Sequence, residues 1–296
     1  IDYKGEHVPS WKLPFYGKDE RQLNNRDYFI SQHSGVMDAS NRHLFNNDLQ
    51  NPYQYDTTKP FQWIRGGGVG GRSLLWYRQC YRFSEADFKA NSDDGHGSGW
   101  PIGYQDLAPW YDYVEDFIGI SGQAEGLEQL PDGKFLPPMK MYGIEKTVKQ
   151  RIEKKIPEIT MTIGRTAVLT ENHRGRAACH YCGPCERGCS TGSYFSTQSS
   201  TLPAAKATNR LTLRPNSVVE RLEYDPENKR VSKIHVIDAK SGERLEFSSK
   251  IVFLCASTIA STQILLNSSS EHFPNGMANS SGVLGKYLMD HTTGII

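Results

Sequence analysis

Four cysteines within eleven residues could bind a metal: Cys179, Cys182, Cys185 and Cys189. Their spacing, C-x2-C-x2-C-x3-C, is typical of bacterial ferredoxins, except that Ser190 stands where proline usually follows the fourth cysteine. Thiolates at this spacing suit an iron–sulfur cluster, and four thiolates also suit zinc. Two local disulfides or reduced structural thiols are the alternative. The sequence therefore predicts a candidate metal site without choosing between metal and structural thiols.

A glycine-rich segment is the second candidate for chemistry, because five of the six residues at 66–71 are glycine. Gly66, Gly68 and Gly71 satisfy G-x-G-x-x-G, but a dinucleotide fingerprint also requires an amphipathic helix directly afterwards. Residues 74–83 are aromatic and look extended, so we do not expect that fingerprint here. Turn glycines that adopt positive φ are one interpretation. The number of glycines favours the other, a backbone that approaches a flat ligand closely.

A third candidate is the segment 250–267, which has the pattern of a strand, a turn of small residues and a helix. Ile251–Cys255 is apolar throughout, as expected for a central parallel strand that is buried on both faces. The helix that follows would offer N–H groups to a phosphate, although any plain strand-to-helix crossover gives the same pattern. Cys255, like Cys80, has apolar or aromatic neighbours and is expected in the core.

The elements that must position these residues can be predicted from periodicity and turn residues. Apolar spacing predicts a helix from Pro109 to Gly119 and a second helix over 144–156, which Pro157 ends. Short strands are predicted at Leu211–Arg214, Val218–Tyr224, Val231–Asp238 and Arg244–Phe247, separated by turn sequences.

Composition narrows the class of protein. The 296 residues carry a net charge of +1, which argues against binding nucleic acid through bulk charge. With 37% hydrophobic and 11% aromatic residues, the chain can form a sizeable core. No apolar run approaches the ~18 residues of a membrane span, and no signal peptide is visible. We expect a soluble protein of the bacterial cytoplasm or periplasm, and a fragment of a longer chain.

Several stretches, in the same order, resemble the glucose–methanol–choline (GMC) family of flavin oxidoreductases. They are Val69–Trp76, Gly99–Trp110, Leu211–Val219, Ile251–Leu266 and Gly285–His291. The first of them resembles the flavin-facing G-G-x-S loop of the family. The resemblance spans about residues 60–296 and is strongest to the sugar-oxidising branch: pyranose oxidases, glucoside 3-dehydrogenases, and gluconate or glucose dehydrogenase large subunits. Pyranose oxidase has a flavin-linked histidine where this chain has Leu75, so the resemblance implies a non-covalent flavin.

The resemblance implies an α/β fold that contains part of a flavin domain and part of a substrate or cap domain. Residues 1–119 would form an N-terminal arm and the flavin-facing loop. Residues 120–200 would form a cap segment that carries the cysteine-rich loop near the surface. Residues 201–296 would belong to the FAD-binding domain.

By the same resemblance, the protein is an FAD-dependent oxidoreductase that acts on a CH–OH group of a sugar, glycoside or alcohol, with hydride passing to flavin N5. The implied cofactor-binding residues are Val69, Gly70, Gly71, Ser73, Trp76, Arg78, Val218, Ala256 and Ser257. Ser73 would donate a hydrogen bond towards N5 or O4, Trp76 would shield the ring, and the Val218 backbone would meet adenine. The cysteine cluster would pass electrons to a small subunit or a cytochrome.

Two family elements are absent from this sequence: the N-terminal G-x-G-x-x-G turn, expected before Ile1, and the catalytic His/Asn pair, expected beyond Ile296. We therefore expect the isolated chain to be inactive and to bind FAD poorly. Two other functions remain open, an iron–sulfur or metal-binding electron-transfer module and a non-catalytic carbohydrate-binding fragment. Visible absorbance distinguishes the three functions. Flavin bands indicate the oxidoreductase, a broad brown band alone indicates the iron–sulfur module, and no visible band indicates the carbohydrate-binding fragment.

Overall fold

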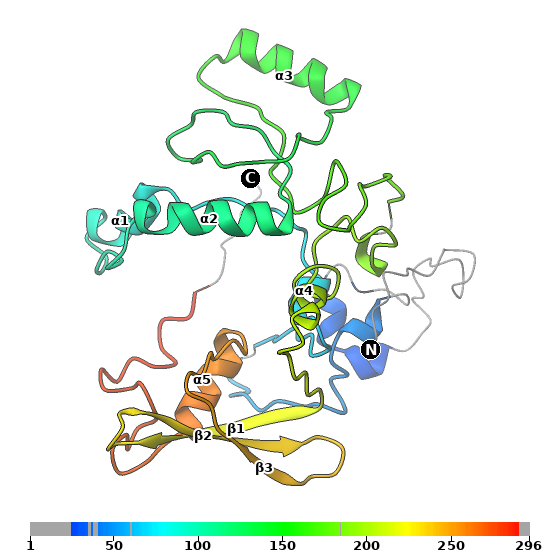
Figure 1. Cartoon of the computed structure of the whole chain (residues 1–296). Coiled ribbons are helices and arrows are strands. Elements are labelled where there is room, and N and C mark those ends of the chain that lie inside the picture. The colour runs from blue at the N-terminus through cyan, green and yellow to red at the C-terminus, as the bar shows by residue number, and fades with distance from the viewer. Residues whose placement is uncertain (1–24, 35–36, 38–40, 60, 184, 290–296) are drawn as a thin grey trace. The chain divides into compact units, whose positions relative to one another are not determined.

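The computed structural model describes residues 25–34, 37, 41–59, 61–183 and 185–289, and the chain divides into two compact units, Ile1–Leu211 and Thr212–Ile296 (Figure 1). Within the described residues, no helix is both long and apolar enough to cross a membrane. The division falls at one position, whereas the sequence predicted boundaries near 119 and 200. Those boundaries stay a prediction.

Unit 1 is built from helices joined by long loops (Figure 1). Its α-helices are α1 (Glu85–Asp93), α2 (Tyr104–Ile118), α3 (Gly143–Lys155) and α4 (Thr201–Ala207). Short 3-10 helices occur at Asn25–Tyr28, Ser31–Ser34, Arg42–Leu44, Gly71–Leu74 and Cys185–Arg187. The helix predicted over 144–156 is confirmed as α3.

Helix α2 begins earlier than its sequence predicted. The Asp106 carboxylate accepts a hydrogen bond of 2.8 Å from the Gly103 N–H, which starts the helix at Tyr104 and leaves Pro109 inside it. This carboxylate cap outweighs the preference of proline for a first turn. The predicted end is confirmed, since Gly119 has φ 76° and its N–H donates to Glu115 O.

Helix α2 turns a charged residue inward together with half-buried apolar and aromatic side chains. The buried face carries Glu115, only 7% exposed, whereas Trp110 and Tyr113 stand exposed on the other side. Glu115 binds the 4% exposed Arg82 through two hydrogen bonds, Nε–Oε1 at 3.0 Å and Nη2–Oε2 at 2.5 Å. Asp112 Oδ1 accepts a third bond at 2.5 Å. Charge-assisted hydrogen bonds therefore fix the helix to unit 1 in addition to its half-buried apolar side chains.

A second arginine cluster lies in the loops after α2. Arg165, 1% exposed, contacts Glu125 at 2.9 Å and Asp132 at 2.8 Å, and its guanidinium also lies over the Phe135 ring. Its Nη1 donates to the Pro131 carbonyl at 2.5 Å. These contacts tie loop segments that are more than thirty residues apart in sequence.

Unit 2 is a three-stranded antiparallel sheet covered by one helix (Figure 1). The strands are β1 (Ser217–Asp225), β2 (Arg230–Asp238) and β3 (Arg244–Phe247), in the order β1-β2-β3, and the helix is α5 (Thr258–Asn267). Leu222, Ile264 and Met277 form its core. The Ser268 hydroxyl donates to Ile264 O and accepts from the Leu222 N–H, which joins the helix to β1.

Two predicted strands of unit 2 are wrong. Leu211–Arg214 has no strand geometry, and the chain becomes a strand only at Ser217. Ile251–Cys255 is not a central strand, because among the described residues no strand pairs with it. Val252 and Leu254 pack on the core, while Phe253 is 83% exposed. Cys255, expected in the core, is exposed as well, whereas Cys80 is half-buried.

The predicted class of mixed helices and strands is confirmed. The sheet, however, is antiparallel throughout the described residues, because tight turns join its three strands.

Candidate functional site

The glycine-rich segment folds as a tight loop that leads into a short 3-10 helix. Gly70 has φ 100° and Gly71 has φ 51°, a backbone region that favours glycine. The Gly71 N–H donates to Gly68 O at 2.8 Å, and the Ser73 N–H donates to Gly70 O at 3.2 Å. No α-helix follows until α1 at Glu85. The expectation that this is not a dinucleotide fingerprint is therefore confirmed.

A second segment, Tyr194–Gln198, braces this loop from more than a hundred residues away. Trp76 Nε1 donates to Phe195 O at 3.3 Å, and the Thr197 N–H donates to Ser73 Oγ at 3.0 Å. Further along, Gln198 Nε2 donates to Val69 O. The structure thus brings together the predicted site residues from 69 to 76, and it does so through residues that the sequence analysis missed. Only the polar texture of 190–200 hinted at them.

The Ser73 hydroxyl is already engaged within the loop. Its single proton is donated to Gly70 O at 2.5 Å, while its oxygen accepts from the Thr197 N–H. Donation towards a flavin atom, as the resemblance implied, would require the bond to Gly70 to break. In the structure Ser73 is a brace of the loop.

Two features of the loop leave room for a ligand. A Cβ built on Gly71 meets no atom within 4 Å, so the space beside this glycine is open. The Gln198 side chain is 9% exposed, yet its Oε1 has no hydrogen-bond partner in the protein. Buried polar atoms nearly always have a partner, so an orphan acceptor in the segment that braces this loop fits a ligand that brings a donor.

Arg78, also predicted to bind the cofactor, lies in the interior of unit 1. It is 6% exposed, its guanidinium lies 3.4 Å from the centre of the Tyr194 ring, and its Nη2 donates to Leu74 O. Its φ of 62° is unusual for a residue other than glycine. Arg78 thus joins the 3-10 helix of the loop to the bracing segment.

The other predicted cofactor residues belong to unit 2. Val218 is exposed near the start of β1, and Ala256 and Ser257 are exposed just before α5. Ser257 caps the helix with φ 73°, and its carbonyl accepts from the Ser261 N–H at 2.8 Å. Their predicted contacts with FAD stay predictions.

The cysteine loop does not form a metal-ligand set. None of the four cysteines forms a disulfide; Cys182 and Cys185 are exposed and the other two are half-buried. Across the described residues, no three His, Cys, Asp or Glu side chains are grouped so as to hold a metal ion. Instead, Cys179 Sγ accepts from the Tyr181 N–H and Cys189 Sγ lies 3.3 Å from Thr191 Oγ1.

The electrostatics of these thiols differ. Burial and the neighbouring thiols raise the pKa of Cys182. At Cys189 burial opposes ionisation, but hydrogen bonds from the Thr191 side chain and from nearby backbone N–H groups outweigh it and lower the pKa. Cys189 therefore ionises more readily than Cys182.

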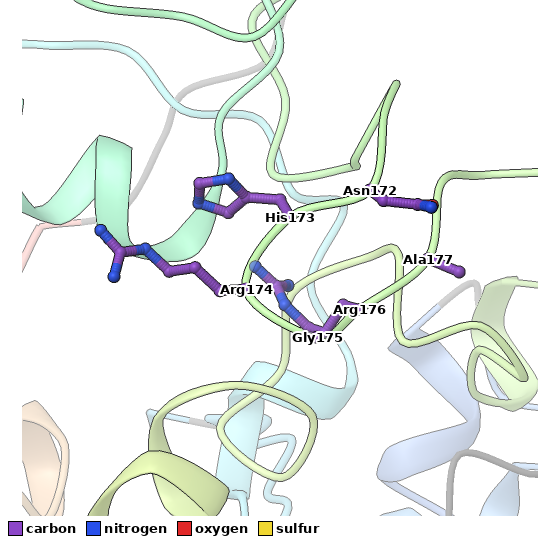
Figure 2. Close-up of a pocket in the computed structure, with 6 residues that line it drawn as sticks. All are labelled: Asn172, His173, Arg174, Gly175, Arg176 and Ala177. Carbon is purple, nitrogen blue, oxygen red and sulfur yellow. The ribbon is translucent and has the colours of Figure 1, made fainter.

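A shallow open pocket of about 320 Å³ is lined by six consecutive residues, 172–177, and looks suited to an anion (Figure 2). Its basic side chains, however, are bound to other parts of the protein and not to the pocket. His173 and Arg174 extend towards the C-terminus of α2. His173 Nε2 lies 2.6 Å from Asp116 O, and Arg174 contacts the Asp116 carboxylate at 2.5 Å. Arg176 donates to Ile118 O. The pocket is the hollow of a hairpin that caps a helix.

Known proteins resemble this chain over most of its length. The family described as GMC oxidoreductase matches residues 29–293. A 2-methyl-1,2-propanediol dehydrogenase from Mycolicibacterium austroafricanum is 31% identical over 75% of this chain and 40% of its own length. The fructose dehydrogenase large subunit of Gluconobacter japonicus is 28% identical over 76% of this chain and 41% of its own length. Paromamine 6'-oxidase of Streptomyces fradiae is 25% identical, over 77% and 42%. The chain spans about two-fifths of the length of these curated relatives.

Proposed function

Because the chain belongs to the GMC oxidoreductase family, we propose that the full-length protein is an FAD-dependent oxidoreductase that oxidises a CH–OH group of an alcohol or sugar. The observation that carries this proposal is the braced glycine loop, with open space at Gly71 and an orphan acceptor on Gln198. The names of the relatives, a diol dehydrogenase, a fructose dehydrogenase subunit and an aminoglycoside oxidase, support CH–OH chemistry.

The residues present fit FAD in this role. When bound, FAD supplies the hydride acceptor for the substrate carbon. The protein's own part is to hold the loop from Val69 to Trp76 rigid, so that its backbone forms one wall of the cofactor site and its aromatic side chain excludes water. Leu75 cannot bond covalently to a flavin, so the cofactor is held by non-covalent contacts.

Gly71 provides the test. A valine there introduces a branched side chain into the open space and strains a φ of 51°. In the full-length protein, Gly71→Val should abolish the flavin absorbance bands of the purified enzyme. Gly126→Val is the matched control, because Gly126 also has positive φ and an open Cβ position but lies outside the site. Equal flavin content in both variants would contradict the proposal.

Substrate class is tested on the loaded wild-type protein. Anaerobic addition of fructose, a vicinal diol or an aminoglycoside should bleach the flavin for one of them and leave it oxidised for the others.

A second candidate function concerns the outlet for electrons. The spacing of Cys179, Cys182, Cys185 and Cys189 favours an iron–sulfur relay to a partner subunit or cytochrome, and one relative is named as a large subunit. Among the described residues these thiols do not form a ligand group, so such a cluster would have to rearrange the loop. Iron analysis and low-temperature electron paramagnetic resonance of anaerobically purified protein test it. Absence of iron, with unchanged activity after Cys182→Ser and Cys185→Ser, would leave the structural interpretation.

A further inference from the structure

The Gln198 carboxamide has a defined orientation. One end of the side chain lies against Val69 O, and a carbonyl oxygen only accepts hydrogen bonds. The amide nitrogen must therefore face Val69, which leaves Oε1 at the other end. Gly70 makes this approach feasible, because a Cβ there would stand only 3.2 Å from Gln198 Cγ.

Oε1 is an unusual atom in this structure. Among the described residues, only two buried side-chain oxygens have no hydrogen-bond partner, Gln198 Oε1 and Asp48 Oδ1. Asp48 is compensated, because its Oδ1 lies 3.7 Å from the guanidinium of Arg65. An unsatisfied buried acceptor such as Gln198 Oε1 destabilises the folded protein. A donor that arrives with a ligand would remove that destabilisation.

We propose that Gln198 is a flavin-binding residue, whose Oε1 accepts a hydrogen bond from the N3–H of the isoalloxazine ring. This inference rests on the proposed function. The oxidised ring carries a single N–H donor, at N3, and its other heteroatoms accept. A neutral carboxamide oxygen, on a side chain whose Cγ packs at Gly70, is the complement of that donor, and the same side chain fixes the loop through Val69.

The experiment compares FAD with N3-methyl-FAD, which lacks the proposed donor. Apoenzyme of the full-length wild type and of Gln198→Met is titrated with each, and Kd is measured by quenching of flavin fluorescence. The wild type should bind N3-methyl-FAD about tenfold more weakly than FAD, equivalent to one good hydrogen bond. Gln198→Met should bind the two alike. The ratio within each variant cancels any general loss of folding.

Gln105→Met is the matched control, because Gln105 is exposed on α2, and it should discriminate as the wild type does. Discrimination that persists undiminished in Gln198→Met would overturn the inference, since another group would then bind N3. Equal Kd values in the wild type would overturn it too. If no form of the protein binds FAD, the proposed function itself fails; binding without the Gln198 effect refutes the inference alone.

Discussion

The two units of the molecule differ in what they bury beside apolar side chains. Over its described residues, unit 1 buries four arginines, Arg78, Arg82, Arg165 and Arg176, together with apolar side chains. Unit 2, over its described residues, buries aliphatic side chains such as Leu222 and Ile264 with a single serine, Ser268. Unit 2 is thus stabilised mainly by apolar burial. Unit 1 adds directional charge-assisted bonds, which fix long loops in one geometry.

The difference explains why the candidate site lies in the unit with few regular elements. Loops cannot be held by a ladder of backbone bonds, so their positions depend on side chains that reach carbonyls and carboxylates. Arg78 and Gln198 do this for the glycine loop, as Arg165 does for the loops after α2. The five tryptophans all precede residue 212, so tryptophan fluorescence reports unit 1 alone.

The largest effect is expected from Arg165→Met. Removing this guanidinium leaves the buried Glu125 carboxylate without its countercharge, and breaking such a pair costs about 3–5 kcal/mol. The free energy of unfolding of unit 1, followed by tryptophan fluorescence in urea, should fall by that amount. A loss below about 1 kcal/mol would show that the cluster contributes little.

Leu222→Ala tests the apolar unit. It removes a core side chain that contacts α5, and the free energy of unfolding of unit 2 should fall by about 2–4 kcal/mol. The change should be visible in far-ultraviolet circular dichroism, while the tryptophan transition stays in place. Leu213→Ala, an exposed leucine of the same unit, is the control. A shift of the tryptophan transition would refute the independence of the two interiors.

Acid should lower the stability of unit 1 by a smaller amount than these substitutions do. The hydrogen bond from Arg82 holds the pKa of Asp112 below its ordinary value of 3.8. A lowered folded-state pKa stabilises the protein above 3.8, and that contribution is lost as pH falls through the folded value. The urea midpoint of the tryptophan transition should therefore drop between pH 5 and pH 3.

Asp112→Asn is the matched variant for this pH dependence. It cannot titrate, so its midpoint should change less with pH than that of the wild type. The same slope in both proteins would assign the acid sensitivity to other carboxylates.

The smallest effect is expected from Arg174→Ala. This arginine pairs with Asp116 at the end of α2, but both side chains are exposed, and such pairs contribute about 0.2–1 kcal/mol. Comparison with Arg165→Met, using the same fluorescence measurement, isolates the effect of burial. If Arg174→Ala lowered the free energy of unfolding as much as Arg165→Met does, the capping of α2, and not the burial of the arginine, would determine the stability of unit 1.

Local patterns predicted the local structure well. The four-residue repeat of Ile144, Val148 and Ile152 gave α3, and turn residues gave the links between β1, β2 and β3. These elements need only neighbours in sequence. Ile251–Cys255 failed because a strand exists only beside another strand, and hydrophobicity cannot show whether a partner is present.

Of the two segments that form the candidate site, the sequence located one, the glycine loop, and missed the other, which carries Gln198. Glycine content located the loop at 66–71, because positive φ leaves a mark in the sequence. No sequence pattern pointed to Gln198, because it is 129 residues from its partner Val69 along the chain. The cysteine spacing identified a candidate ligand set, yet Cys179 and Cys189 bond with their own loop instead. Spacing along the chain does not fix directions in space.

The exposed side of Ile251–Cys255 has a consequence for handling the protein. Ile251 and Phe253 project into solvent from an extended backbone that has no neighbouring strand among the described residues. Such a bare hydrophobic edge is a template on which a second molecule can add, and no lysine or proline within it blocks that addition. Addition of a second molecule at this segment would increase with protein concentration, so dilution should reduce it.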